Sequence, residues 1–128
     1  MIITGVHHVA IICSDYAISK HFYTKILPFK IVQEVYRAER QSYKLDLRLG
    51  RKYQIELFSF PNPPKRASRP EACGLRHIAF ATKNIEHAVS ELHKKGVETE
   101  AIRIDEWTGK KFTFFADPDG LPIELYEN

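Results

Sequence analysis

Two histidines and two glutamates recur at matching positions in the two halves of the chain. The stretch "HHVAIICSD" (7–15) parallels "RHIAFATKN" (76–84) when the two are aligned on His8 and His77, and the tripeptide "IEL" occurs at 55–57 and again at 123–125. His8 and His77 are 69 positions apart, while Glu56 and Glu124 are 68 apart. Each half therefore supplies one histidine and one glutamate in corresponding places.

Two imidazoles and two carboxylates suit one divalent transition metal per site: nickel, zinc, cobalt, manganese or iron. A structural zinc site more often uses thiolates, and no cysteine belongs to this pattern, which favours an open site with positions left for substrate oxygens. Taken singly, each of these residues is more often a hydrogen-bonded or solvated polar side chain. Their duplicated register favours the metal interpretation and predicts His8, Glu56, His77 and Glu124 as ligands.

Strand alternation assigns faces to these residues, because successive side chains of a strand point to opposite sides. His8 shares a face with Ala10, and Glu56 points away from the aliphatic side chains of Ile55 and Leu57. His7 falls on the other face. We therefore expect replacement of His7 by alanine to leave the metal content nearly unchanged.

The elements that must position these residues follow the same order twice. A strand is expected at 2–13, then a helix at 16–27 capped by Asp15 and stopped by Pro28, then strands at 29–36, 42–49 and 51–60. The second half predicts a strand at 75–82, a helix from Asn84 to Gly96, and strands at 97–104, 111–117 and 121–128, of which 97–104 has poor alternation. This is an α+β protein made of two tandem βαβββ modules.

The boundary between the modules is marked by composition. Residues 61–74, "PNPPKRASRPEACG", hold four of the seven prolines and show no periodic pattern. We expect a first module at 1–60, a stiff Pro-rich linker at 61–74 and a second module at 75–128, which together make one domain.

Composition excludes several kinds of partner. The 128 residues carry a net charge of +3, too small and too dispersed to argue for nucleic acid. No stretch is apolar enough to span a membrane, and the start of the chain has no signal-peptide pattern. The two cysteines form no pair motif, so both are expected to be buried, reduced thiols in the cytoplasm. A small-molecule substrate is the expected partner.

Four stretches resemble the vicinal oxygen chelate superfamily, which includes glyoxalases, bleomycin-resistance proteins and dioxygenases. These are "HHVAIICSDYAISKHFYTKIL", "YQIELFSF", "GLRHIAFAT" and "FFADPDGLPIELYE", and they are most similar to small bacterial glyoxalase I-like (lactoylglutathione lyase-like) proteins. The resemblance implies an eight-stranded, U-shaped mixed sheet with flanking helices and the same four metal ligands. It also implies a homodimer, and it leaves open whether the modules pair within or between chains.

The resemblance further implies a metal-dependent lyase or isomerase. Its substrate would be the hemithioacetal of a 2-oxoaldehyde or a related oxygen-chelating molecule, and the reaction would pass through a metal-bound enediolate. Glu124 is expected as the catalytic base, with Glu56 as its partner or a second base. Arg37 and Arg40 are candidates for substrate binding, although a solvated strand face explains such residues equally well.

Four alternatives stay open at this point. An acyl-CoA epimerase uses the same enolate chemistry. A fosfomycin-type thiol transferase or a ring-cleaving dioxygenase uses two histidines and one carboxylate, so the fourth ligand counts against both. A non-catalytic, antibiotic-binding protein would need no complete ligand set.

Overall fold

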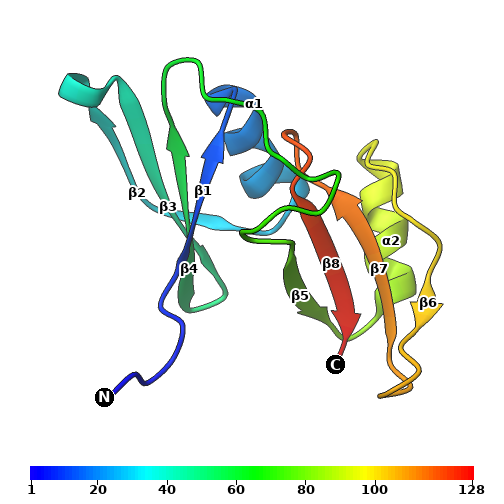
Figure 1. Ribbon diagram of the computed structural model, residues 1–128. Coiled ribbons are helices and arrows are strands. Elements are labelled where there is room, and N and C mark those ends of the chain that lie inside the picture. The colour runs from blue at the N-terminus through cyan, green and yellow to red at the C-terminus, as the bar shows by residue number, and fades with distance from the viewer. The chain divides into compact units, whose positions relative to one another are not determined.

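The computed structural model describes residues 1–128 and divides the chain into two compact units, Met1–Lys65 and Arg66–Asn128. Each unit contains one βαβββ module with its own four-stranded mixed sheet and one main helix (Figure 1). The predicted α+β class and the tandem modules are confirmed. The modules are described one by one below.

The first module begins with strand β1 (Val9–Cys13) and helix α1 (Tyr16–His21), which continues into a π-helical turn, Phe22–Ile26. Three strands follow: β2 (Lys30–Arg37), β3 (Ser42–Leu49) and β4 (Lys52–Ser59). The sheet order is β1-β4-β3-β2, and β1 runs parallel to β4 while the other neighbours are antiparallel. The parallel pairing brings the first and last strands of the module side by side.

The first helix forms where the sequence predicts it. The Asp15 carboxylate accepts a hydrogen bond from the Ile18 amide at 3.1 Å, which satisfies one of the donors left open at a helix start. At the other end, the Leu27 amide donates to the Phe22 carbonyl at 2.8 Å, five residues back, so the last turn is a π turn rather than an α turn. Pro28 follows directly, as expected of a residue that cannot extend a helix.

The second module repeats this plan with β5 (Ile78–Thr82), α2 (Ile85–Lys94), β6 (Arg103–Ile104), β7 (Lys111–Ala116) and β8 (Pro122–Glu127). Its sheet order is β5-β8-β7-β6, again with the first and last strands parallel. Asn84 caps α2 through the His87 amide at 2.9 Å, and Gly96 takes the positive φ of 82° that ends the helix.

Strand β6 is much shorter than the predicted strand at 97–104. Only two of these residues pair with β7. Of the preceding residues, Val97 donates its amide hydrogen bond to the Leu92 carbonyl at the end of α2, and Glu100 makes one isolated backbone hydrogen bond, to the Phe114 carbonyl of β7. The poor alternation of "VETEAIRI" explains the difference, since no continuous apolar face exists to bury a longer strand.

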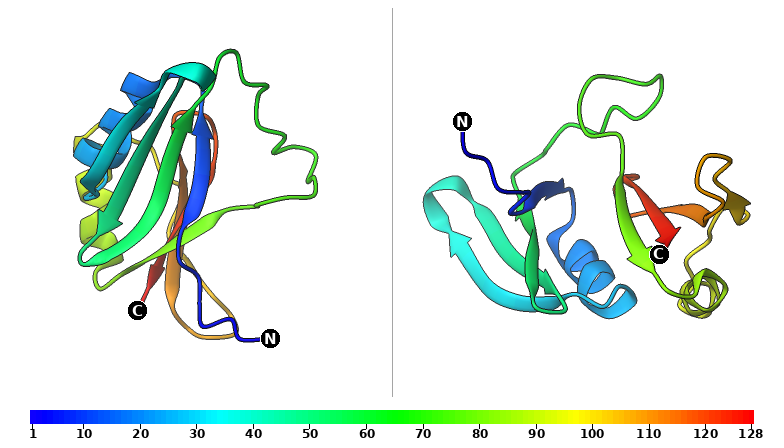
Figure 2. Two further views of the ribbon diagram at one scale, coloured as in Figure 1. Left: turned by 90° about the vertical axis from the view of Figure 1, so that its left-hand side faces the viewer. Right: turned by 90° about the horizontal axis from the view of Figure 1, so that it is seen from below.

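Each sheet has one buried and one open face. Each helix lies against one face of its own sheet (Figure 2), and the strand residues on that face are buried: Ile11, Cys13, Leu45, Leu47, Ile55 and Leu57 in the first module, and Thr113, Phe115, Ile123 and Leu125 in the second. Glu56 and Glu124 alternate with these buried residues. Their side chains therefore point to the open face.

The segment between the sheets, residues 60–77, contains no helix or strand. Cys73 lies in it and is exposed, so the prediction that both cysteines are buried is wrong for Cys73; Cys13 is buried, and neither forms a disulfide. No helix in the structure is both long and apolar enough to cross a membrane.

Candidate metal centre

The first module places His8 beside Glu56. The imidazole Nε2 lies 3.2 Å from the carboxylate Oε2, and Glu56 is only 12% exposed while His8 is 36% exposed. The parallel register sets Ala10, two residues after the histidine, opposite Glu56 on β4. A methyl group at this position leaves room for the imidazole to lean over the carboxylate.

The second module repeats this histidine–glutamate contact at nearly the same distance. His77 Nε2 lies 3.1 Å from Glu124 Oε2, and Ala79 is paired with Glu124 across the parallel strands. The side chains of His77 and Glu124 are 28% and 14% exposed. The structure thus brings together the two predicted residues of each module, and each histidine directly precedes the strand in which it was expected.

The geometry of each pair fits two neighbouring ligands of one cation. Metal–nitrogen and metal–oxygen bonds of about 2.0–2.2 Å at right angles separate the two donor atoms by about 3.0 Å. The observed separations are 3.2 and 3.1 Å. No third histidine, cysteine or carboxylate completes a metal cluster within either module. Each module therefore presents one histidine–glutamate pair.

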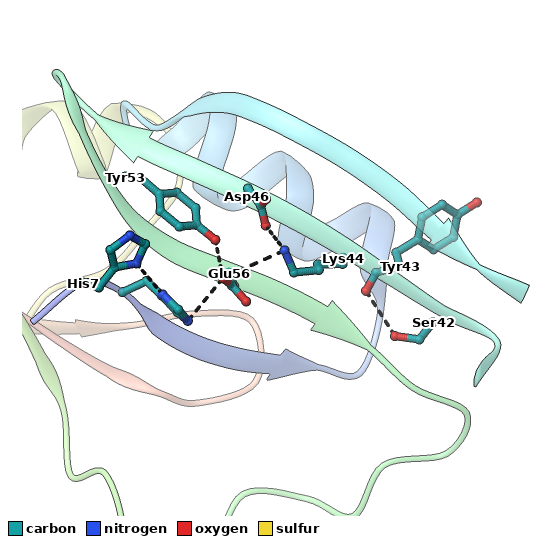
Figure 3. Close-up of polar contacts among 8 residues, drawn as sticks. His7, Ser42, Tyr43, Lys44, Asp46, Tyr53 and Glu56 are labelled. Carbon is teal, nitrogen blue, oxygen red and sulfur yellow. Dashed lines mark hydrogen bonds and ion pairs between the residues drawn. The ribbon is translucent and has the colours of Figure 1, made fainter. Parts of the chain in front are cut away.

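Glu56 has further donors around it (Figure 3). The Tyr53 hydroxyl donates to its carboxylate, and Lys44 Nζ lies 3.9 Å from Oε2 while making an ion pair of 2.8 Å with Asp46. Burial and the hydrogen bond to Glu56 raise the pKa of Tyr53, so this phenol keeps its proton and remains a donor. These contacts hold the carboxylate in one orientation.

These three neighbours are absent from the residues predicted as site residues. Lys44 and Asp46 alternate along β3, and Asp46 is in register with Glu56, so a signal was present in the strand pattern. Tyr53 gave no such signal. It is three residues from Glu56, and it reaches the carboxylate where the β3–β4 register shifts, between the pairs Leu47–Ile55 and Arg48–Tyr53. Such a bulge re-aims a side chain that regular alternation would send to the core.

The second half-site has different neighbours. Phe114 is in register with Glu124, in the place that Asp46 occupies in the first module, and its ring stands edge-on to the His77 ring with centroids 5.2 Å apart. Phe112, two residues earlier, shares its face. The first half-site is therefore surrounded by charged and hydroxyl groups, and the second by aromatic rings.

His7 does not lie on the far face, as alternation predicted. Its Nδ1 is 2.8 Å from His8 Nδ1, and its ring packs edge-on against the Tyr53 ring. The reason is that β1 begins only at Val9, so the period of two does not extend back to His7. The prediction of its face is wrong, and His7 is a direct neighbour of the proposed ligand.

The two predicted substrate-binding arginines lie at the end of the first sheet. Arg37 is half-buried, donates from Nη2 to the Ser42 hydroxyl at 2.8 Å, and places its guanidinium 4.9 Å from the centroid of the Phe58 ring. Phe58 is two residues from Glu56 on β4 and so faces the same side. Arg40 is exposed in the short 3₁₀ turn after β2 and does not join this group.

Comparison with known proteins agrees with this architecture over the full chain. The sequence profile of the Glyoxalase/Bleomycin resistance protein/Dioxygenase superfamily matches residues 5–125. An uncharacterised protein of Bacillus subtilis (strain 168), YwkD, is 62% identical over 127 residues, which is 99% of each chain.

A solved structure and a more distant relative extend the comparison. The crystal structure of a glyoxalase family protein from Enterococcus faecalis shares 48% identity and superimposes with a TM-score of 0.92, covering 99% of this chain and 100% of the other. A 2-epi-5-epi-valiolone epimerase from Actinomyces sp. is 28% identical over 143 residues, which is 94% of this chain and 78% of that protein. The chain therefore belongs to the Glyoxalase/Bleomycin resistance protein/Dioxygenase superfamily.

Proposed function

We propose that the protein is a metal-dependent, glyoxalase I-like isomerase of the lactoylglutathione lyase class. Its substrate is a small molecule with two vicinal oxygens, such as the hemithioacetal of a 2-oxoaldehyde. The observation that supports this most directly is the repetition of one histidine–glutamate pair, at 3.2 Å and 3.1 Å, in two modules. The fold does not require this pair in both modules, because an ion pair of this kind stabilises a folded protein only slightly.

Four side chains would hold the cation: His8 and Glu56 from one module, and His77 and Glu124 from another. The two modules come from one chain or from the two chains of a homodimer. The cation is a divalent transition metal (nickel, zinc, cobalt, manganese or iron), and when bound it supplies Lewis-acid stabilisation of negative charge on the substrate oxygens. Both free cysteines are consistent with the reducing cytoplasm, which we propose as the compartment.

Glu124 is the proposed catalytic base. It removes the proton from the carbon next to the carbonyl, giving an enediolate, and returns that proton to the neighbouring carbon. A carboxylate that moves a proton must be able to leave the cation. Glu124 has only His77 as an ion-pair partner, whereas Glu56 is also held by Tyr53 and Lys44. Glu56 therefore suits the role of permanent ligand, with proton transfer as a secondary role.

A second candidate function is epimerisation through an enolate. The Actinomyces relative is named as an epimerase, and such a reaction uses the same proton removal next to a carbonyl. Epimerisation needs one group to remove the proton and one to return it, for which Glu56 and Glu124 are the candidates, and an acyl-CoA is one substrate of this kind. A fosfomycin-type thiol transferase and a non-catalytic, antibiotic-binding protein are the remaining alternatives.

Metal analysis and product identification test the proposal together. The protein is purified without added metal, reconstituted with each candidate ion, and offered hemithioacetals, acyl-CoA thioesters, fosfomycin with a thiol, and catechols, with products identified by mass spectrometry. We expect close to one metal per chain and a 2-hydroxyacyl thioester as product. Less than about 0.2 metal per chain after reconstitution would contradict the proposal and favour the non-catalytic binding protein.

A further inference from the structure

The second module contains a cavity of about 870 Å³ that begins at the proposed metal ligands and extends well beyond them. His77 and Glu124 line one part of it. A group that only chelates a metal through two vicinal oxygens consists of a few atoms and is much smaller than this cavity. Cavities of several hundred Å³ are typical of sites that enclose a whole small molecule. The rest of this cavity has room for a further part of the substrate, which is called its arm below.

The wall next to the metal ligands is aromatic. Phe114 lies edge-on to His77, and Phe112 lies one alternation further along β7, away from Glu124 in the register. Both rings line the cavity. They offer an apolar surface for the part of the arm closest to the chelating oxygens.

Beyond the rings the lining is charged, and its cations outnumber its anions. Apart from Glu124, the lining contains four arginines and three glutamates: Arg66, Arg69, Arg76, Arg103, Glu71, Glu98 and Glu100. Arg76 is already engaged, because it makes two hydrogen bonds to Glu71. Arg66 is a structural residue. It donates to Ser68 and to the carbonyls of Leu75 and Arg76, which fixes the backbone that leads into His77.

Two arginines remain available to a ligand. Arg103 uses Nη2 for a 3.0 Å bond to Glu100, and its guanidinium lies 4.9 Å from the centroid of the Phe112 ring, so the aromatic wall holds it in place with other N–H groups unused. Arg69 makes no direct hydrogen bond, although its charge helps to lower the pKa of the Glu71 carboxyl, whose main partner is Arg76. The single unpaired carboxylate of the lining is Glu98, and its negative charge would weaken the binding of an anion in this cavity.

We propose that this cavity is an anion subsite, in which Arg103 and Arg69 bind a carboxylate or phosphate group at the end of the substrate arm and Phe112 packs against its apolar part. A guanidinium presents several N–H groups in a fixed plane that matches the oxygens of both anions. The inference rests on the proposed function, since it assumes that His77 and Glu124 hold a cation to which the substrate chelates. It narrows the substrate class to oxygen-chelating molecules with an anionic terminus.

Matched hydroxamates test the subsite, because each binds a metal through two vicinal oxygens and only their arms differ. Acetohydroxamate has no arm, succinic monohydroxamate ends in a carboxylate and phosphonoacetohydroxamate in a phosphonate. Calorimetric titration of the cobalt-loaded protein should show at least one anionic probe binding tenfold tighter than acetohydroxamate, and comparison of the two identifies the preferred anion. Arg69→Gln with Arg103→Gln should reduce this preference to less than twofold without changing acetohydroxamate binding.

Two variants control for charge. Arg51→Gln removes a cation from the first module, outside the cavity lining, and should keep the tenfold preference. Glu98→Gln removes the opposing carboxylate from the cavity itself and should preserve or increase it. Equal binding of all three probes by the wild-type protein would overturn the anion subsite, as would a loss of preference in Arg51→Gln equal to that in the double variant.

A metal-free measurement separates the subsite from the proposed function. Without metal, methylphosphonate or propionate should shift the amide resonances of Arg103, Phe112 and Arg69 at millimolar concentration, and the double variant should abolish these shifts. If acetohydroxamate fails to bind the metal-treated protein while these shifts are present, the proposed function is wrong and the subsite stands. If acetohydroxamate binds and no anion shifts these residues, the subsite is wrong and the proposed function stands.

Discussion

At the scale of single residues, the two glutamates are alike in position and unlike in surroundings. Glu56 accepts a hydrogen bond from Tyr53 and lies near Lys44, which is in turn paired with Asp46. Glu124 has an ion pair with His77 and an aromatic neighbour in register. Equal positions favour equal roles as ligands, and unequal surroundings favour unequal roles in proton transfer.

Replacement of each glutamate by glutamine should separate these roles. We expect Glu124→Gln to lower kcat by at least a hundredfold, because the proton acceptor is lost, while much of the metal remains bound. Glu56→Gln should lower metal affinity more than Glu124→Gln does, since it also leaves the Lys44 and Tyr53 donors with a poorer acceptor. Single-turnover kinetics and metal titration of both variants measure this; near-normal turnover of Glu124→Gln would exclude it as the base.

The position of His7 in the structure changes the prediction that strand alternation gave for its replacement by alanine. Because its Nδ1 lies 2.8 Å from His8 Nδ1, we expect it to fix the orientation of the ligand ring. His7→Ala should weaken metal affinity about tenfold and leave the stoichiometry at saturating metal unchanged. Competition titration with a coloured chelator gives the affinity. His87→Ala, an exposed change on α2, is the matched control and should leave it unaltered.

At the scale of elements, the parallel pairing of the first and last strand is what builds each half-site. The register Ala10–Glu56 recurs as Ala79–Glu124, so a shift by one residue in either sheet would send the glutamate to the buried face.

A group of polar and aromatic contacts joins α1 to its own sheet. The Tyr16 hydroxyl donates to Glu34, the Tyr16 ring stacks on Tyr43 with centroids 4.2 Å apart, and Lys20 pairs with Glu34 at 2.7 Å.

This connection should weaken at alkaline pH. Burial and the hydrogen bond to Glu34 raise the pKa of Tyr16 above its ordinary value, so the folded protein favours the neutral phenol. The resulting stabilisation is complete below about pH 10 and is lost as the pH rises further. We expect Tyr16→Phe to lower the free energy of unfolding by about 1 kcal/mol at pH 8, and the difference from wild type to shrink towards pH 11. Thermal unfolding of both proteins at pH 8–11 measures it; a difference that stays constant would contradict this explanation.

At the scale of the whole molecule, a metal bound by both modules would make their stability interdependent. A ligand that binds only the folded state raises stability in proportion to the logarithm of its concentration over its dissociation constant. Because each module would supply only two of the proposed ligands, neither is expected to hold the cation tightly alone.

The thermal shift on adding metal should therefore vanish when either module loses its histidine. We expect His8→Ala and His77→Ala each to abolish most of the shift, and the double variant to add little, because the two losses affect one site. Removal of metal from the wild-type protein with a chelator should lower Tm by the same amount. Additive losses in the two single variants would indicate two independent sites and contradict a shared one.

The local pattern of the sequence was sufficient for most of the fold and for the four proposed ligands. The caps at Asp15 and Asn84, the helix end at Gly96 and the strand periods are local signals, and the structure confirms the elements they predicted, except that the first strand begins at Val9 rather than at residue 2. The duplication drew attention to the two histidine–glutamate pairs, because corresponding residues of repeated modules occupy corresponding places in the structure. Where the local signal was weak, at 97–104, the predicted strand shrank to two residues.

Only the tertiary structure decided which side chains surround each histidine–glutamate pair. Tyr53 reaches Glu56 because of a register shift, His7 touches His8 because β1 begins only at Val9, and Phe114 stands beside His77 because β7 pairs with β8. Each of these contacts joins residues through strand pairing or through an irregularity in it, and a pattern of period two contains no information about either. The sequence alone could therefore predict a metal ligand in the repeated stretch "HHVAIICSD", while the groups that distinguish the two histidine–glutamate pairs became visible only in the folded sheets.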